Sequence, residues 1–180
     1  MSVLHQLSRL FAELNARRVR ALVVGVSGVN FYARTGHTIF ATEDQDLLLP
    51  TDPATLLSAW EACEARGLEL FANQEPLDSP HDLFLAQRVA RLRATTRATD
   101  GDLLHVDLTF VFGAFSFEEV WERRKVFTLE GVEVSVASLA DIVRAKASAG
   151  RMKDRMFLTS HEAALREWLR EESEGPPPPP

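Results

Sequence analysis

Apolar residues recur every three or four positions in several segments of the chain, which is the spacing of an amphipathic helix. The first segment predicts a helix that ends near Asn15, with an apolar face formed by Leu4, Leu7, Leu10, Phe11 and Leu14. The same spacing, or a capping residue before an apolar segment, predicts further helices over 52–66, 117–124, 138–149 and about 152–170. The last of them is expected to bury Met156, Leu165 and Leu169.

Shorter apolar runs bounded by glycine, proline or turn residues predict strands over 21–24, 44–49, 83–97, 103–112, 126–129 and 132–136. Asp100-Gly101 and Glu130-Gly131 supply hairpin turns, so 83–97 is expected to pair with 103–112, and 126–129 with 132–136. Residues 68–81 are expected to be irregular, and Ser27 is expected to cap a short helix over 27–32. Together these elements predict an α+β fold with a mixed, mostly antiparallel sheet flanked by helices.

Length and composition predict a single globular domain, because 180 residues with 46% apolar and 26% charged positions suit one hydrophobic core. We expect this domain to cover 1–172, with a core over about 18–136 and a C-terminal helical part over 137–172. An acidic breaker and five prolines predict a disordered tail over 173–180.

Several classes of protein are excluded by the same composition. No apolar run approaches 18 residues and the first residues lack the apolar block of a signal peptide, so a cytoplasmic location is expected. Cys63 is the only cysteine and the five histidines are scattered, which argues against a disulfide and a structural zinc site. The net charge of −6 argues against a surface devoted to nucleic acid.

Three aspartates are the strongest candidates for chemistry. Asp44 and Asp46 open one strand and share a face, and Asp107 lies on the non-core face of a later apolar strand. If strand 21–24 runs antiparallel beside strand 44–49, the turn at Gly25–Ser27 lies at the same sheet edge and could cradle phosphates. Clustered carboxylates repel one another, so the trio is expected to bind Mg²⁺ or Mn²⁺, ions that serve phosphoryl transfer.

Other charged residues allow two interpretations each. An isolated pair of aspartates at a strand start is usually solvated, and only the addition of Asp107 favours a site. His105 shares a face with Asp107 and is more consistent with a structural histidine than with a general base. Arg91, Arg93 and Arg97 would share one face of strand 83–97, either to contact phosphate or RNA, or to protect a sheet edge.

The ordered set of these motifs resembles the nucleotidyltransferase superfamily with the DNA polymerase β-like fold, especially its small bacterial toxin-type and minimal branch. The resemblance rests on four segments: Gly25-Val26-Ser27-Gly28, Thr42-x-Asp44-x-Asp46, the later Asp107, and the stretch from Ser138 to Asp154. It implies that the aspartate trio is catalytic and binds the metal. It further implies nucleotide binding by Gly25, Ser27, Lys146 and Arg151.

The resemblance implies an enzyme that moves a nucleoside monophosphate from an NTP to an acceptor hydroxyl and releases pyrophosphate. The acceptor would be RNA or tRNA, a protein, or a small molecule such as an aminoglycoside, and an antitoxin would be a further partner. The alternative is a degenerate, non-catalytic module that binds a nucleotide or a protein. Two departures from the family pattern favour this alternative. Val26 separates Gly25 from Ser27, and Phe40 stands where the family often has an arginine, a position whose charge Arg34 could replace.

Overall fold

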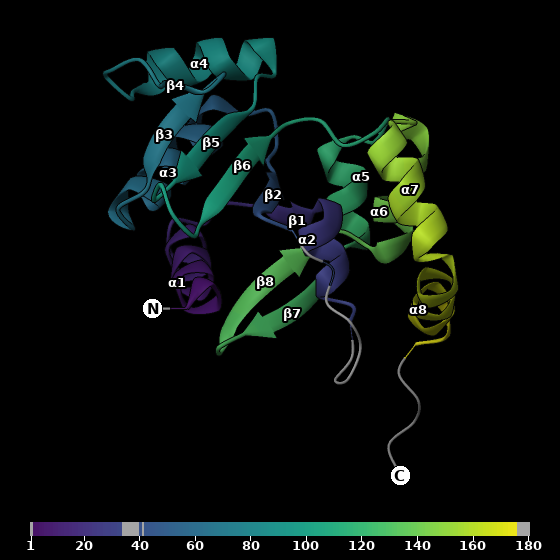
Figure 1. Ribbon diagram of the computed structural model, residues 1–180. Coiled ribbons are helices and arrows are strands. Elements are labelled where there is room, and N and C mark those ends of the chain that lie inside the picture. The colour runs from purple at the N-terminus through teal and green to yellow at the C-terminus, as the bar shows by residue number, and fades with distance from the viewer. Residues whose placement is uncertain (1, 34–39, 41, 176–180) are drawn as a thin grey trace.

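The structure is a computed structural model that describes residues 2–33, 40 and 42–175. Within these residues the strands form one mixed sheet in the order β4-β3-β5-β6-β2-β1-β8-β7 (Figure 1). The strands are β1 (Leu22–Val24), β2 (Asp44–Leu48), β3 (Glu69–Ala72), β4 (Glu75–Pro76), β5 (Thr96–Thr99), β6 (His105–Thr109), β7 (Lys125–Leu129) and β8 (Val132–Val136). The helices are α1 (Val3–Ala16), α2 (Gly25–Asn30), α3 (Pro53–Ala65), α4 (Leu83–Leu92), α5 (Phe117–Arg123), α6 (Leu139–Ala149), α7 (Met152–Ser160) and α8 (Glu162–Glu174).

The sheet is mixed, as the sequence predicts. β2 pairs antiparallel with β1 and parallel with β6, and β1 pairs parallel with β8. The other pairs are antiparallel and include the two predicted hairpins, β5–β6 and β7–β8. β2 therefore lies at the centre of the sheet, between the strand that leads into α2 and the strand that carries Asp107.

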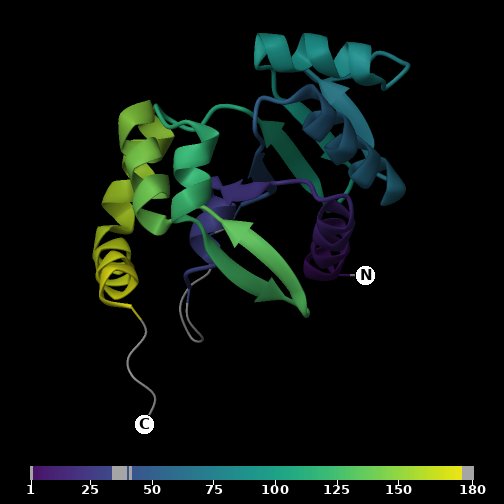
Figure 2. The same ribbon diagram turned by 180° about the vertical axis from the view of Figure 1, so that it is seen from behind.

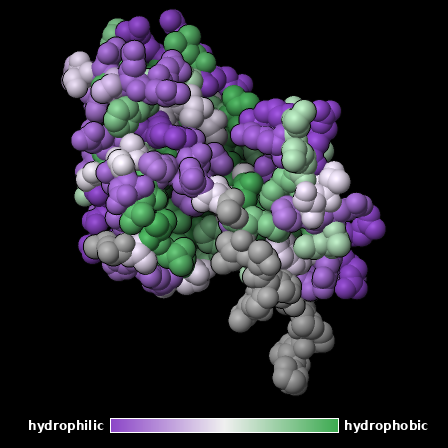
Figure 3. All heavy atoms as spheres, in the orientation of Figure 1, coloured by the Kyte–Doolittle hydropathy of each residue, from purple (hydrophilic) through white to green (hydrophobic). Residues whose placement is uncertain are grey.

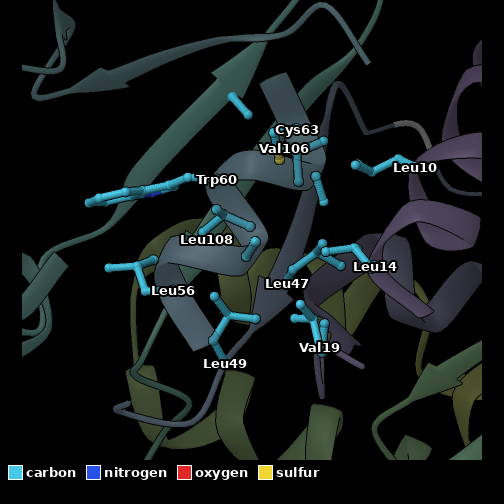
Figure 4. Packing of buried hydrophobic residues seen from close by; sticks show 14 of the residues in the cluster. Leu10, Leu14, Val19, Leu47, Leu49, Leu56, Trp60, Cys63, Val106 and Leu108 are labelled. Atoms are coloured by element: carbon cyan, nitrogen blue, oxygen red, sulfur yellow. The ribbon is translucent and has the colours of Figure 1, made fainter. Parts of the chain in front are cut away.

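One face of the sheet packs against α1 and α3. Figure 4 shows Trp60 and Cys63 of α3 beside Leu47 of β2 and Leu108 of β6, with Leu14 of α1 completing the layer. All of these side chains are buried, which is the expected result of the alternation of apolar and polar positions along β2 and β6. The indole Nε1 of Trp60 donates a hydrogen bond of 3.0 Å to Thr96 Oγ1, which satisfies its polar group inside this core.

The other face of the sheet is covered only in part. A second core joins β1 and the end of β2 to the C-terminal helices, and its members include Leu22, Leu48, Ile142 and Trp168. Both views place α5–α8 together on one side of the molecule, away from α3 and α4 (Figure 1 and Figure 2). The start of β2 and the middle of β6 are left uncovered on this face, and the candidate site lies there.

The prediction of a strand over 83–97 is wrong, because most of this segment forms α4. The Asp82 side chain accepts a hydrogen bond from the backbone N–H of Leu85 and caps the helix. Ala86, Val89 and Ala90 lie at helical spacing and are buried, which favours a helix over a strand. Only β5 remains as a strand, and Arg91 and Arg93 do not share a strand face with Arg97.

Residues 68–81 are not wholly irregular, and the last predicted helix is divided. The first of these segments contains β3 and β4, which extend the sheet at its edge. The predicted helix over about 152–170 breaks at His161 into α7 and α8, and Met156 is 62% exposed rather than buried. The second helix continues through Glu174, so the acidic breaker is mostly helical and the predicted disordered tail does not begin at 173. Residues 176–180 of that tail lie outside the described residues.

One predicted helix cap is also corrected. Ser27 does not cap α2, since this helix begins at Gly25 and no side chain caps it. Ser138 caps α6 by accepting from the N–H of Asp141, but the Asp141 carboxylate bonds to Arg123 instead of completing a capping box. No helix in the described part of the chain is both long enough and apolar enough to cross a membrane.

Candidate active site

A row of directly opposite residues crosses five strands and forms the base of the candidate site. Asp46 on β2 pairs with Val24 on β1 and with Asp107 on β6. Asp107 also lies opposite Arg97 on β5, which in turn lies opposite Phe71 on β3. Side chains of directly opposite residues point to the same face of a sheet, so Asp46, Asp107 and Arg97 meet on the uncovered face.

The guanidinium of Arg97 joins two of the three aspartates. Its Nε donates to Asp107 Oδ1 and its Nη2 to Asp107 Oδ2, both at 2.8 Å, which is a bidentate pair. The same Nη2 lies 3.0 Å from Asp44 Oδ1. The hydrogen bond to Asp107 is the main reason that the pKa of Arg97 rises above its ordinary value. Arg97 therefore stays charged and acts as a counter-ion to both carboxylates.

The third aspartate, Asp46, is held by the turn between β1 and α2. The Ser27 hydroxyl donates to Val24 O at 3.0 Å and accepts from the backbone N–H of Asp46 at 3.3 Å. Gly25 has a φ of +66°, and a Cβ built there would collide with Asp46 Oδ2. Burial, followed by the negative charges of Asp107 and Asp44, raises the pKa of Asp46 to about 6. The turn thus holds the Asp46 carboxylate close to the two other carboxylates, and Lys146 and Lys153 offset only part of their repulsion.

Cations lie on the opposite side of the site, where α6 meets α7. Lys146 Nζ lies 3.2 Å from Asp154 Oδ1, and Arg151 Nε donates to Asp154 Oδ2 at 2.6 Å. The Asp154 side chain is 1% exposed. Its burial tends to raise its pKa, but the hydrogen bonds from Arg151 and Lys146 outweigh burial and hold the pKa below the ordinary value. Asp154 therefore fixes both cations at the edge of the site.

A cleft of about 900 Å³ separates these two groups of charges. We call Asp44, Asp46 and Asp107 the sheet wall, and Lys146, Arg151 and Lys153 the helix wall. Both walls line the cleft, and Gly25 and Phe157 line it as well. Figure 3 shows the surface hollowed between the part of the molecule with the sheet and the part with the C-terminal helices. A ligand with anionic groups and a bound cation would match both walls, because its anionic groups suit the helix wall and its cation suits the sheet wall.

The sheet wall fits a divalent cation in the kind of ligand it offers, since Mg²⁺ and Mn²⁺ prefer carboxylate oxygens. In the described part of the chain, however, no three acidic, histidine or cysteine side chains are arranged as a ready ion site. The guanidinium of Arg97 contacts both Asp44 and Asp107 and serves as their counter-ion.

Most of the residues that the sequence singled out meet at this cleft. Its lining includes Asp44, Asp46, Asp107, Gly25, Lys146 and Arg151. Ser27 is not among the lining residues and is 3% exposed, so it supports the strand behind Asp46. Phe40 is buried against Phe157 and Trp168, while Arg34 lies outside the described residues.

Sequence reasoning missed the pairing of Arg97 with the trio and gave too little weight to Asp154. The signal for Arg97 was the predicted hairpin around Asp100-Gly101, whose register places Arg97 opposite Asp107. The predicted strand over 83–97 was too long, so it did not single out Arg97 as the residue opposite Asp107. Asp154 lies between Lys153 and Arg155, as on an ordinary charged helix face, and the burial of a single carboxylate cannot be seen in such a local pattern.

No protein-family model matches the chain, and no curated protein matches it in sequence. Among solved structures, the chain is similar to the solution structure of the antibiotic-resistance factor ANT(2'')-Ia, an aminoglycoside nucleotidyltransferase. The TM-score is 0.55 at 17% sequence identity, and the match covers 95% of this chain and 90% of that chain. The fold is nucleotidyltransferase-like. This likeness confirms the predicted fold and gives no support to the toxin-type branch.

Proposed function

We propose that this chain is a metal-dependent nucleotidyltransferase, which moves a nucleoside monophosphate from an NTP to an acceptor hydroxyl and releases pyrophosphate. The observation that carries the proposal is the cleft, in which three aspartates face three cations. A triphosphate that carries a divalent cation matches both walls, because its phosphates suit lysine and arginine and its metal suits carboxylates. The nucleotidyltransferase-like fold supports the same assignment.

The sheet wall would hold Mg²⁺ or Mn²⁺, which when bound would neutralise charge on the triphosphate and lower the pKa of the acceptor hydroxyl. The chain's own residues position the reactants around it. Lys146, Arg151 and Lys153 contact the phosphates that leave, and Asp154 holds the first two of these cations in place. Gly25 lines the cleft, so its backbone would contact the nucleotide, and its lack of a side chain leaves room for the Asp46 carboxylate beside it.

The transfer reaction requires one bond to form and one to break. The acceptor oxygen attacks the α-phosphorus, and the bond between that phosphorus and the oxygen bridging to the β-phosphate breaks. Pyrophosphate leaves with the electron pair of the broken bond, and the hydroxyl proton passes to the carboxylate of Asp107. Asp107 suits this role because it borders both the main cleft and a second groove beside it.

A second candidate function is a non-catalytic module of the same fold, and the contacts of Arg97 favour it. Because this guanidinium bonds to Asp44 and Asp107, these carboxylates have a cation without any metal. Such a module would bind a nucleotide or a protein partner, such as the antitoxin of a toxin–antitoxin pair. That role, like the choice of RNA, protein or small molecule as acceptor, rests on the sequence resemblance alone.

Calorimetric titration of each NTP, with and without Mg²⁺, tests the proposed function. We expect the wild type to bind at least one NTP in a Mg²⁺-dependent way. The variant Asp46→Asn keeps the size of the side chain and should lose that binding, because it removes a charge from the sheet wall. The matched control is Asp78→Asn, which removes the same charge from an exposed loop and should bind like the wild type.

The outcomes separate the two candidate functions. Release of pyrophosphate by the wild type when candidate acceptors are added, and its loss in Asp46→Asn, would support the transferase. NTP binding without any release would favour the non-catalytic module. If no NTP binds to the folded wild type, the proposed transferase is wrong, and a search for a protein partner is the next step.

A further inference from the structure

A second groove of about 500 Å³ opens beside the cleft, on the side of Asp107 that faces away from the helix wall. It shares Thr95 and Asp107 with the cleft, so a ligand in the groove can reach Asp107 from that side. Strands β3, β5 and β6 and the turns next to them supply its lining residues, which are Phe71, Asn73, Gln74, Thr95, Arg97, Thr99, Gly101, His105 and Asp107.

The charge of the groove restricts the kind of ligand that fits it. Among the described residues that line it, Asp107 is the only acidic one, and its carboxylate is already bonded to Arg97. Glu69 lies on the same face opposite Thr99 but is not among the lining residues. A polycation would therefore meet Arg97 without compensating carboxylates, whereas an anion would meet a cation and several hydrogen-bond donors.

The guanidinium of Arg97 has further hydrogen-bond donors that such an anion could use. Its hydrogen bonds to Asp107 come from Nε and Nη2, and Nη2 also forms the ion pair with Asp44. None of its described contacts uses Nη1, which carries two further N–H groups. The side chain is 42% exposed, so this end of the guanidinium is within reach of a ligand. A phosphate oxygen is a suitable acceptor for these donors.

The turn between β3 and β4 adds two amide side chains at the edge of the groove. Asn73 and Gln74 form a two-residue hairpin turn in which both residues have positive φ, of 50° and 68°. Glycine is the favoured residue at the second position of such a turn, and a glutamine there strains the backbone. The chain thus keeps a side chain with a donor and an acceptor at a position where glycine would be more stable.

We propose that this groove is the acceptor subsite and that Arg97 selects an acceptor whose hydroxyl lies near a phosphate, as in a nucleotide. This proposal rests on the proposed function, because it assigns the acceptor of the same transfer. The Arg97 guanidinium binds the phosphate through Nη1, Phe71 supplies a flat apolar surface for a base, and the acceptor hydroxyl lies beside Asp107. The polycationic acceptors of aminoglycoside nucleotidyltransferases do not fit this groove.

Nuclear magnetic resonance on the full ¹⁵N-labelled chain tests the proposal without any turnover. The probes are 5′-AMP, adenosine and the polycation kanamycin, each added with and without Mg²⁺ and a non-hydrolysable NTP. We expect 5′-AMP, but not the other two, to shift the signals of Arg97 Nε–H and of the Asn73 and Gln74 side-chain amides. A short single-stranded RNA that binds about tenfold more tightly than 5′-AMP would identify an RNA 3′ end as the source of the acceptor; equal affinity would identify a free nucleotide.

Two variants and one control make the test specific. Arg97→Gln should weaken 5′-AMP binding about tenfold to a hundredfold, because it removes a charged hydrogen-bond donor. Gln74→Gly should raise the urea midpoint of unfolding by relieving strain, yet weaken 5′-AMP binding, and this combination excludes a folding defect. Arg91→Gln removes an exposed arginine of α4 outside the groove and should leave 5′-AMP binding unchanged.

Any one of four results would overturn the acceptor assignment. The first is a set of 5′-AMP shifts confined to Gly25 and the helix wall, and the second is equal shifts with adenosine. The third is a shift of the groove signals by kanamycin, and the fourth is the absence of any shift. None of these results depends on NTP binding, which the calorimetric titration measures separately, so failure of the acceptor assignment can be told apart from failure of the proposed function.

Discussion

Each aspartate of the sheet wall is placed on its face by its strand and is held there by contacts with neighbouring residues. Asp107 and Asp44 owe their position to Arg97, and Asp46 owes its position to Gly25 and Ser27. Burial, together with the negative charges of its neighbours, raises the pKa of Asp46. A small change at Gly25 should therefore act on Asp46 before it acts on the rest of the fold.

The substitution Gly25→Ala tests this dependence. At a φ of +66° an alanine costs about 1–2 kcal/mol of stability, and its Cβ also collides with Asp46 Oδ2. The control is Gly67→Ala, where φ is +75° but a Cβ meets no atom within 4 Å. Urea unfolding should show a similar loss of stability in both variants, since both adopt the left-handed conformation.

Only the variant at Gly25 should also displace the carboxylate of Asp46. We expect Gly25→Ala to lose Mg²⁺-dependent NTP binding in calorimetry, while Gly67→Ala keeps it. If both variants bind the nucleotide equally well, then the close approach of Gly25 to Asp46 has no part in forming the sheet wall.

At the residue scale, the trio could be predicted but its counter-ion could not. Alternation along an apolar strand places Asp107 on the non-core face, and the same rule places Asp44 and Asp46 together. Arg97 joins them only through the register of a hairpin, which a single sequence does not fix. The buried state of Asp154 depends on how two helices meet, and this too lies beyond a local pattern.

At the scale of elements, the predictions were correct for the central strands of the sheet and wrong for the segment 83–97 near its edge. Three strands, β1, β2 and β6, are apolar runs with clear boundaries, so the sequence predicts them as strands. The segment that forms α4 contains leucine, valine and arginine in a mixture that is compatible with a helix or a strand. Asp82, which caps the helix, is the local feature that favours a helix there.

The contact between α8 and α6 gives a test at this scale. The carboxylate of Glu172 accepts hydrogen bonds from the backbone N–H groups of Leu139 at 2.9 Å and Ala140 at 3.2 Å. These groups lie in the first turn of α6 and have no partner within the helix. Glu172→Ala should lower the free energy of unfolding by about 1 kcal/mol, as loss of a helix cap does.

Circular dichroism during urea unfolding measures this effect, with Glu167→Ala as the control. Glu167 is an exposed glutamate of the same helix, and its loss should change stability little. A similar stability for the two variants would show that α8 does not cap α6. The acidic segment near the C-terminus would then have no role in holding the helix wall.

At the scale of the whole molecule, the cleft is a junction between two parts that carry opposite charge. The sheet wall belongs to β2 and β6, and the helix wall belongs to α6, α7 and the two-residue link between them, which contains Arg151. The two parts are joined behind the cleft by the second core, which includes Leu48 of β2 and Ile142 of α6. A ligand that contacts both walls adds a second connection across the front of the cleft.

We therefore expect Mg²⁺ and an NTP together to stabilise the two parts as one unit. A ligand present at 100 times its dissociation constant adds about 2.7 kcal/mol to the stability of the folded state. A non-hydrolysable NTP with Mg²⁺ should raise the midpoint of thermal unfolding, and either component alone should raise it less. Hydrogen exchange should slow at the start of β2 and at the α6–α7 junction in the same titration, because the ligand contacts both.

Variants on either wall show whether the two parts respond together. Asp46→Asn changes the sheet wall, and Lys153→Ala changes an exposed cation of the helix wall. If one ligand bridges the cleft, each variant should reduce the ligand's protection of backbone amides on both walls, although it alters only one. Protection that is lost only on the altered wall would mean that the walls bind separate ligands, and one NTP could not then be held as the transfer reaction requires.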